Sequence, residues 1–345
     1  MFQSKSKIDR SWLMIAALSA GALLTVRQLV RWWREYNLHD KTVLITGGSR
    51  GLGLVMARQF VQKGAKVAIC ARDETELLRA QDDLVRQGGE VLTVVCDVTS
   101  KQDVYRMVAK VLTHFGHIDV LVNNAGTIAV GPMEVMTQQD YEEAMKIHFW
   151  APFYTTLAVL PEMRRRRNGR IVNISSIGGK LSVPHLLPYS ASKFALVGFS
   201  EGLRAELAKD GIVVTTVCPG LMRTGSPRNA FFKGQHQAEY TWFSISDALP
   251  FISMSAERAA SQIIKACQHG DAEVVLTLPA KLATLLHGIF PGFTEDMLGF
   301  INKLLPAPGG IGSQRAKGAE SYTDLSPSWL TTLSDQAAER NNEVA

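Results

Sequence analysis

A tyrosine and a lysine four residues apart, Tyr189 and Lys193, have the types and spacing that proton transfer requires. On a helix, residues four apart lie on one face. A tyrosine with an ordinary pKa of about 10 is a poor acid at neutral pH, but a neighbouring positive charge lowers that pKa. Ser176, which follows a strand-like run, would hold a substrate oxygen beside the tyrosine. The three side chains suit protonation of a carbonyl oxygen that receives a hydride. The alternative is a packed tyrosine and an exposed lysine.

A glycine-rich segment, residues 41–53, reads KTVLITGGSRGLG and joins an expected strand to an expected helix. Gly47, Gly51 and Gly53 would supply the tight turn, the close approach to a phosphate and the helix–strand contact. The pyrophosphate of a dinucleotide would rest on backbone N–H groups at the start of the helix. The segment therefore predicts a dinucleotide site, with a merely tight strand–helix turn as the alternative.

The end of the second strand-like run bears on the choice between NAD and NADP. An acidic residue there would bind the ribose 2′-hydroxyl and favour NAD. In this sequence Ala71 stands at that place, Arg72 follows it, and Arg50 lies in the glycine-rich segment. Either arginine alone would pass for a solvated surface residue, but two guanidinium groups suit a 2′-phosphate. We therefore expect NADP(H) to be preferred over NAD(H).

Four motifs in order along the chain resemble those of the short-chain dehydrogenase/reductase family. They are the TGxxxGxG loop at residues 46–53, the NNAG motif at 123–126, the YxxxK motif at 189–193 with Ser176 before it, and Pro219-Gly220 with Thr224 after the sixth expected strand. The resemblance covers roughly residues 39–278. It implies a Tyr–Lys–Ser catalytic group and a bound nicotinamide dinucleotide.

The resemblance also implies roles for residues around the cofactor. Asp97 and Val98 would flank the adenine, and Asn123 would support the cofactor cleft. The backbone of Met222 and the side chain of Thr224 would meet the nicotinamide carboxamide. The full set of expected cofactor-binding residues is Gly47, Ser49, Arg50, Gly51, Leu52, Gly53, Arg72, Asp97, Val98, Asn123, Tyr189, Lys193, Met222 and Thr224.

One position departs from the family pattern. Many members carry a catalytic asparagine in a pattern like VNLxG, where it holds a water that links the lysine to solvent. Residues 147–151 read IHFWA, so His148 stands where the asparagine is expected. A histidine also binds water and carries protons, and His148 is therefore the fourth catalytic candidate. The alternatives are a damaged relay or a histidine that only caps a helix bend.

These side chains need a scaffold, and residues 41–278 alternate apolar strand-like runs with stretches of helical spacing. The expected strands are 42–46, 66–71, 91–97, 118–123, 170–175, 212–218 and 273–276. Runs this apolar are buried on both faces, which is typical of a parallel sheet covered by helices. We expect an α/β fold with a Rossmann-type doubly wound parallel sheet of about seven strands, forming an NADP-binding catalytic domain over residues 37–278.

The N-terminal segment, residues 1–36, differs from the rest of the chain. Ser11–Val30 is uncharged apart from Arg27, and its 20 residues would span about 30 Å as a helix. Trp12 and the pair at 32–33 flank it, as an aromatic belt would. We expect an anchor in the lipid bilayer through residues 11–30, with the catalytic domain facing the cytoplasm. A cleaved signal peptide and a buried helix are the alternatives.

The C-terminal segment also departs from the strand–helix alternation. Residues 279–305 predict an amphipathic helical hairpin, broken at Pro291-Gly292. Packing of this hairpin on the domain and a membrane-facing or substrate-covering role are both open. Residues 306–345 are rich in proline, glycine, serine and charge, and we expect a flexible tail.

The composition bounds the function further. The chain has 345 residues, 46% of them hydrophobic, and a net charge of +5, which is too small to indicate nucleic-acid binding. The four cysteines have no CxxC spacing, so neither a metal site nor a disulfide framework is expected, and a reducing compartment fits best. A homo-oligomer remains open.

The segment 225–255 would cover the substrate and suggests what it is. It contains six aromatic residues, which favour an apolar substrate. They are Phe231, Phe232, Tyr240, Trp242, Phe243 and Phe251. The sequence therefore predicts an NADP(H)-dependent oxidoreductase that reduces a carbonyl or oxidises a secondary alcohol on a lipid, sterol or acyl-type substrate. The alternative is a non-catalytic nucleotide-binding sensor or scaffold at a membrane.

Overall fold

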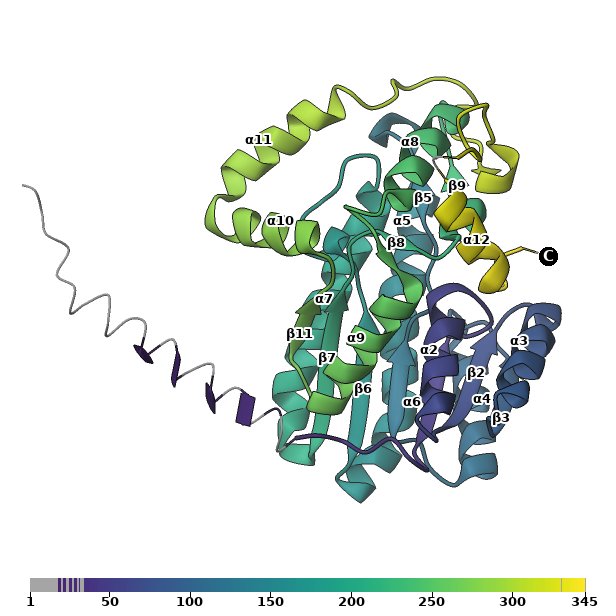
Figure 1. The fold of residues 1–345 in the computed structure, drawn as a ribbon, viewed down its shortest axis with the longest axis vertical. Coiled ribbons are helices and arrows are strands. Elements are labelled where there is room, and N and C mark those ends of the chain that lie inside the picture. The colour runs from purple at the N-terminus through teal and green to yellow at the C-terminus, as the bar shows by residue number, and fades with distance from the viewer. Residues whose placement is uncertain are drawn as a thin grey trace, which may run out of the picture.

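A seven-stranded parallel sheet forms the centre of the molecule (Figure 1). The computed structural model describes residues 18–19, 21–22, 25–26, 28–29, 31, 34–329 and 331–344. The strand order is β11-β7-β6-β4-β1-β2-β3, and each neighbouring pair is parallel. The strands are β1 (Thr42–Thr46), β2 (Lys66–Ala71), β3 (Val91–Val95), β4 (Val120–Asn123), β6 (Gly169–Ile174), β7 (Ile212–Cys218) and β11 (Glu273–Val275).

Helices cover both faces of this sheet and bury two separate apolar cores. One face carries α2 (Gly51–Gln62), α3 (Glu74–Arg86) and α9 (Ala256–His269). The other carries α4 (Lys101–Phe115), α6 (Ala151–Arg166) and α7 (Leu187–Leu207). Because both faces are covered, the strands are apolar throughout, and apolar burial is the main stabilising term. The predicted Rossmann-type doubly wound α/β sheet is confirmed.

Local sequence signals place the helix ends. Asp73 begins α3 by accepting a hydrogen bond from the Glu76 N–H, and Ser100 begins α4 by accepting one from Asp103. Helix α4 ends at Gly116, whose φ of 82° lies in the region that favours glycine. These caps fix where each helix leaves the sheet, and so position the loops at the carboxyl ends of the strands.

Shorter elements lie beyond those carboxyl ends (Figure 1). Two small sheets have the orders β10-β8 and β12-β9-β5. The strands are β5 (Ala129–Val130), β8 (Met222–Arg223), β9 (Phe231–Phe232), β10 (Met254–Ser255) and β12 (Ala316–Lys317). The helical elements there are α5 (Gln138–Met145), a π-helical turn (Lys146–Trp150), α8 (His236–Ala248), α12 (Thr332–Arg340) and 3-10 turns at Met133–Val135, Ile177–Gly179, Ser226–Asn229 and Gly318–Glu320. A further 3-10 turn, Ala208–Asp210, joins α7 to the start of β7 at the other end of the sheet.

The C-terminal segment differs from the flexible tail that the sequence predicted. Residues 316–317 pair as β12 with β9, and α12 packs against α8 and β8. Arg315 is paired with Asp140 at 2.6 Å. The polar residues of this segment therefore make specific contacts with the domain. Composition alone does not distinguish such residues from solvent-exposed ones.

The hairpin formed by α10 (Leu278–Ile289) and α11 (Pro291–Asn302) stands away from the sheet (Figure 1). Its apolar residues remain exposed: Leu285 is 60% exposed, Phe293 61% and Phe300 63%. Packing on the domain, one of the two alternatives, does not bury this apolar face. A contiguous exposed apolar surface on a protein usually marks an interaction site.

The predicted membrane anchor, residues 11–30, lies largely outside the described residues. The described residues at 18–29 are helical, and among them Leu18 and Leu29 are exposed. Within the part of the chain that the structure describes, no helix is both long and apolar enough to cross a membrane. Arg31 pairs with Asp271 at 3.0 Å and so ties this end to the domain.

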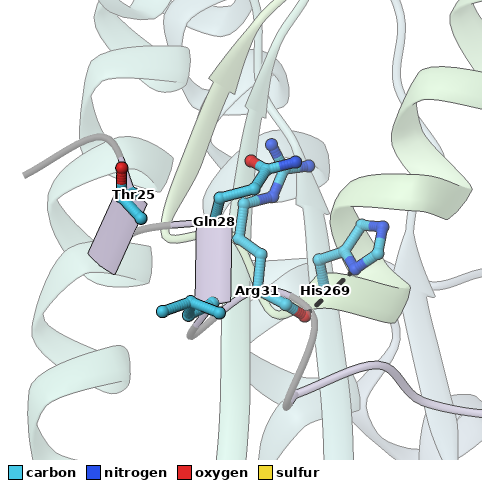
Figure 2. A pocket seen from close by; sticks show the side chains of 5 residues that line it. Thr25, Gln28, Arg31 and His269 are labelled. Atoms are coloured by element: carbon cyan, nitrogen blue, oxygen red, sulfur yellow. Dashed lines mark hydrogen bonds between the residues drawn. The ribbon is translucent and has the colours of Figure 1, made fainter. Parts of the chain in front are cut away.

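An open cavity of about 420 Å³ lies where the N-terminal residues meet the end of α9 (Figure 2). The His269 Nδ1 is 3.2 Å from the Arg31 carbonyl oxygen. The lining residues are Thr25, Gln28, Leu29, Arg31 and His269. Because α9 ends there and leads to the start of β11, this cavity lies at the opposite end of the strands from the predicted catalytic residues.

Candidate active site

The structure brings Ser176, Tyr189 and Lys193 together at the carboxyl end of β6. Ser176 follows the strand within two residues, and the other two lie in the first turns of α7. The Ser176 side chain lies close enough to the Tyr189 hydroxyl to lower its pKa. The Lys193 Nζ lies 5.5 Å from the centre of the Tyr189 ring. This is where ligands bind in open α/β sheets.

Burial dominates the electrostatics of this group. It raises the pKa of Tyr189, although the Ser176 side chain acts to lower it. Burial also lowers the pKa of Lys193 to about 7, and its Nζ donates to the Ile174 carbonyl at 2.9 Å. The sequence predicted that Lys193 would lower the pKa of Tyr189, whereas in the structure burial raises that pKa. The physical reason is that both groups lie in an apolar environment that penalises their charged forms.

His148 lies in the π-helical turn and is buried against Tyr189, with ring centres 5.2 Å apart. The Thr127 N–H donates to its Nε2 at 3.3 Å, so the proton sits on Nδ1, which donates to the Ser192 Oγ at 2.8 Å. Burial, and then the charge of Lys193, hold the pKa of His148 well below its usual range. His148 is therefore a neutral imidazole whose two nitrogens both have protein partners. A relay through it requires one of these contacts to open.

The glycine-rich segment has the geometry that the sequence predicted. A Cβ at Gly53 would lie 2.0 Å from the Gly47 carbonyl oxygen, so only glycine allows this close strand–helix contact. Gly51 has a φ of 54°, in the region that favours glycine. The Asn124 Nδ2 donates to the carbonyls of Thr46 and Gly47, both at 3.1 Å, and so holds the loop against β4. Leu52 is buried at the start of α2.

The two arginines expected at the 2′-phosphate differ in their surroundings. The Arg50 Nη1 donates to Glu76 at 2.7 Å, and the Ser49 Oγ donates to the same carboxylate at 2.9 Å. Arg72 is exposed and directly follows β2. Arg72 is therefore better placed than Arg50 to receive a phosphate from solvent.

Two of the residues expected at the nucleotide end make local contacts instead of leaving their polar groups open. Asp97 accepts from the N–H and the Oγ1 of Thr99, at 2.9 and 2.8 Å. The Asn123 Nδ2 donates to the Asn173 Oδ1 at 2.8 Å, and the Thr155 hydroxyl donates to Asn123 at 2.6 Å. Asn123 thus joins β4 to β6 and supports the cleft from within the sheet. Val98 is buried.

The residues expected at the nicotinamide end lie along β8. The Met222 N–H donates to the Asp247 Oδ1 at 3.1 Å, and the Thr224 Oγ1 accepts from the Ser226 N–H at 3.2 Å. Burial raises the pKa of Asp247 to about 7. Sequence reasoning missed Asp247, because an acidic residue in an amphipathic helix normally faces solvent and only the fold shows it buried.

The aromatic residues of segment 225–255 mostly pack against one another instead of lining an open cleft, which corrects the expectation. The rings of Tyr240 and Phe243 contact Phe232 with centres 5.4 and 5.9 Å away. Phe251 is 91% exposed. The cluster nevertheless borders Tyr189, which packs against it together with Trp242. The wall beside the tyrosine is therefore apolar.

A buried polar group that the sequence did not predict lies in the same wall. The His185 Nδ1 is 2.7 Å from one Glu239 oxygen, and the Trp242 Nε1 donates to the other at 2.7 Å. His185 is buried although it precedes α7 in a loop. The sequence held no local signal for this group, because its members come from a loop and from α8.

Comparison with known proteins gives the same family as the motifs. Residues 41–232 match the model of the short chain dehydrogenase family. A dehydrogenase/reductase SDR family protein 7-like from Anopheles gambiae is 37% identical over 277 residues, which are 77% of this chain and 86% of the relative. An 11-beta-hydroxysteroid dehydrogenase-like 2 from Arabidopsis thaliana is 33% identical over 77% of this chain and 82% of its own length.

A solved structure adds a ligand-bound relative. The L-sorbose reductase from Gluconobacter frateurii, complexed with NADPH and L-sorbose, matches with a TM-score of 0.62 and 26% identity. The match covers 69% of this chain and 95% of the reductase. Fold, motifs and relatives agree: the chain belongs to the short-chain dehydrogenase/reductase family of oxidoreductases.

Proposed function

We propose that this oxidoreductase uses NADP(H) to reduce a carbonyl, or to oxidise the matching secondary alcohol, on an apolar substrate of the lipid, sterol or acyl type. The observation that carries the proposal is the grouping of Ser176, Tyr189 and Lys193 at the carboxyl end of β6, with the lysine ammonium against the tyrosine ring. The glycine-rich segment before α2 fits a dinucleotide, because its close backbone contacts exclude side chains.

When bound, NADPH would supply a hydride to the carbonyl carbon. The Ser176 hydroxyl would donate a hydrogen bond to the carbonyl oxygen and hold it beside Tyr189. The Tyr189 hydroxyl would give its proton to that oxygen as the carbon–oxygen double bond becomes single, which completes the alcohol. Lys193, with a pKa of about 7, would return a proton to the tyrosine, because it exchanges protons readily near neutral pH.

The surroundings of Tyr189 support an apolar substrate. Val183, Trp242 and Tyr189 itself pack against an apolar cluster that includes Leu186 and Phe243. A buried apolar wall gains free energy when it covers apolar substrate surface, whereas it leaves sugar hydroxyls without partners. The name of the hydroxysteroid dehydrogenase-like relative points to the same substrate class.

The test is NADPH consumption by the purified protein with a panel of ketones that increase in apolar length, from a sugar ketone such as L-sorbose to long-chain and steroid ketones. We expect turnover to rise along that series. A protein that binds NADPH but turns over none of these compounds would support the sensor alternative. Faster turnover of the sugar than of the apolar ketones would contradict the substrate class.

The preference for NADP(H) gives a separate prediction. Replacing Arg72 with alanine should weaken NADPH binding about tenfold and change NADH binding less than about twofold, because only NADPH carries the 2′-phosphate. Equilibrium binding of both cofactors measures this. Arg86→Ala removes the same charge from another exposed site and is the control. Equal losses for NADPH and NADH in Arg72→Ala would contradict the assignment.

We also propose that residues 11–30 anchor the protein in a membrane, that the anchor is not cleaved, and that the catalytic domain faces the cytoplasm. The exposed apolar face of the α10–α11 hairpin supports a second membrane contact, because ten of its large apolar residues stay accessible. These are Leu278, Leu282, Leu285, Ile289, Phe290, Phe293, Met297, Phe300, Ile301 and Leu304. The free cysteines, all buried, fit a reducing compartment.

Fractionation of cell membranes tests the anchor. We expect the full chain to stay with membranes through an alkaline wash, and a form that starts at Asn37 to lose most of that attachment. A hairpin variant, Leu285→Glu with Phe293→Glu, should weaken the remaining attachment of the shortened form. A soluble full chain, or a mature N-terminus after residue 19, would contradict the anchor. Tight binding of the shortened form would make the hairpin the main attachment.

A further inference from the structure

The last described residues of the chain occupy the start of α2, where the cofactor phosphates are expected. The Gly51 N–H donates to the Asn341 carbonyl oxygen at 2.9 Å. A Cβ placed on Gly51 would lie 2.4 Å from Glu343 Oε1, so this carboxylate lies directly against the glycine. The carbonyl oxygen of Asn341 and the carboxyl group of Glu343 therefore occupy the N-terminal end of α2 in the glycine-rich segment.

Glu343 is a buried carboxyl group with two polar partners. Its side chain is 5% exposed, the Asn229 Nδ2 donates to its Oε2 at 2.6 Å, and the Arg50 Nε lies 3.5 Å from the same oxygen. Burial raises the pKa of Glu343 to about 7, more than Arg50 and the Asn229 hydrogen bond lower it. Burial therefore disfavours the ionised form of this carboxyl group, so its docking carries a desolvation cost that is relieved when a phosphate displaces it.

Further contacts fix the residues on either side of that carboxylate. The Asn342 Nδ2 donates to the carbonyls of Ser49 and Glu76, at 2.9 and 3.1 Å. Arg58 donates to the Asn341 Oδ1 at 3.1 Å. Residues 341–343 are thus bound to the glycine-rich segment, to α2 and to the start of α3, next to Arg50.

Helix α12, which leads to these residues, covers the other end of the expected cofactor groove. A Cβ on Gly225 would lie 2.4 Å from the Ala338 Cβ, so α12 lies against the backbone next to Thr224. The Ser334 side chain of α12 lies close enough to Asp247, whose Oδ1 accepts from the Met222 N–H, to lower the pKa of that carboxyl. The C-terminal segment therefore follows the groove from its nicotinamide end to its phosphate end.

We propose that residues 341–343 form a C-terminal plug that competes with the phosphates of the dinucleotide, so that the cofactor must displace the plug to bind. The proposal rests on the dinucleotide site of the proposed function. One N–H cannot donate fully to Asn341 and to a phosphate together, and the Glu343 carboxylate repels a phosphate at the same place. Only the undocked protein binds NADPH, so the apparent affinity is the intrinsic affinity multiplied by the undocked fraction. By the same linkage, bound NADPH releases the plug.

The experiment compares NADPH binding by the full chain, by a form that ends at Arg340, and by Glu343→Ala. Glu339→Ala removes the same charge from an exposed position of α12 and is the matched control. We expect the shortened form and Glu343→Ala to bind NADPH about tenfold more tightly than the full chain, with Glu339→Ala unchanged. Hydrogen exchange of residues 331–344 is the second readout, and NADPH should accelerate it in the full chain.

The possible outcomes distinguish failure of the plug proposal from failure of the proposed reductase function. Equal affinity in all four proteins would overturn the plug and leave the dinucleotide site in place. Weaker binding by the shortened form, with slower exchange of residues 331–344 when NADPH is added, would also overturn it, because the segment would then hold the cofactor in place. Absence of NADPH binding in every form would overturn the proposed function, and the plug with it.

Discussion

Replacing Tyr189 with phenylalanine should reduce ketone turnover by about 10²- to 10⁴-fold, the usual contribution of a positioned acid or base. The substitution removes the hydroxyl that lies near Ser176 and keeps the ring that packs against His148. NADPH affinity should change less than about twofold, because that hydroxyl acts on the substrate oxygen. Steady-state rates with the best ketone and equilibrium NADPH binding measure the two effects.

A matched control is available on a neighbouring helix. Tyr154 lies in α6, stacks on Trp150 and is not one of the expected site residues. Tyr154→Phe removes the same hydroxyl and should keep near-native turnover. Near-native turnover in Tyr189→Phe would exclude Tyr189 as the acid. A loss of NADPH binding in Tyr189→Phe that matches the loss of turnover would assign the tyrosine to the cofactor instead.

Much of the sheet could be predicted from the sequence because its signals are local. Buried parallel strands read as continuous apolar runs, and the bounds of β1, β2 and β7 agree with the runs 42–46, 66–71 and 212–218. The chemistry-bearing residues were found for a similar reason. Tyr189 and Lys193 lie one helix turn apart, and the glycines of residues 47–53 lie at one strand–helix junction.

The rest depends on contacts between residues far apart in the chain. Nothing near Glu343 in the sequence indicates Arg50 or Asn229 as its partners, so its segment reads as a solvated tail. The state of His148 depends equally on distant groups, because Thr127 and Ser192 occupy its two nitrogens. Burial also reverses charge arguments made from spacing alone, as the raised pKa of Tyr189 shows.

Asp140 gives the largest expected loss of stability. Its carboxylate accepts from the Lys233 Nζ at 2.5 Å and from Arg315 at 2.6 Å, and it also caps α5 by accepting from the Thr137 N–H at 2.7 Å. Lys233 is 2% exposed, whereas Arg315 keeps Glu143 as a second partner at 2.6 Å. Asp140→Ala would therefore leave Lys233 as a buried charge without its carboxylate. We expect a loss of about 3 to 5 kcal/mol in the free energy of unfolding.

The same carboxylate sets a pH dependence whose sign follows from its pKa. Burial raises the pKa of Asp140, but the hydrogen bonds from Lys233, Thr137 and Arg315 outweigh it and lower the pKa to about 2. Because the folded pKa lies below the unfolded value of about 4, this stabilisation is complete above pH 4 or so, and it disappears as the pH falls through about 2. Asp140→Ala should therefore flatten the stability profile across that range.

Denaturant unfolding at several pH values measures both effects, with Glu142→Ala on the exposed side of α5 as the control. The double variant Asp140→Leu with Lys233→Met removes both charges and should recover much of the loss, because apolar side chains of similar size replace a buried pair at little cost. A single variant within about 1 kcal/mol of the control would mean that water or a rearranged neighbour compensates Lys233. A double variant as unstable as Asp140→Ala would assign the loss to the α5 cap and the Arg315 contact, and so to the docking of the C-terminal segment.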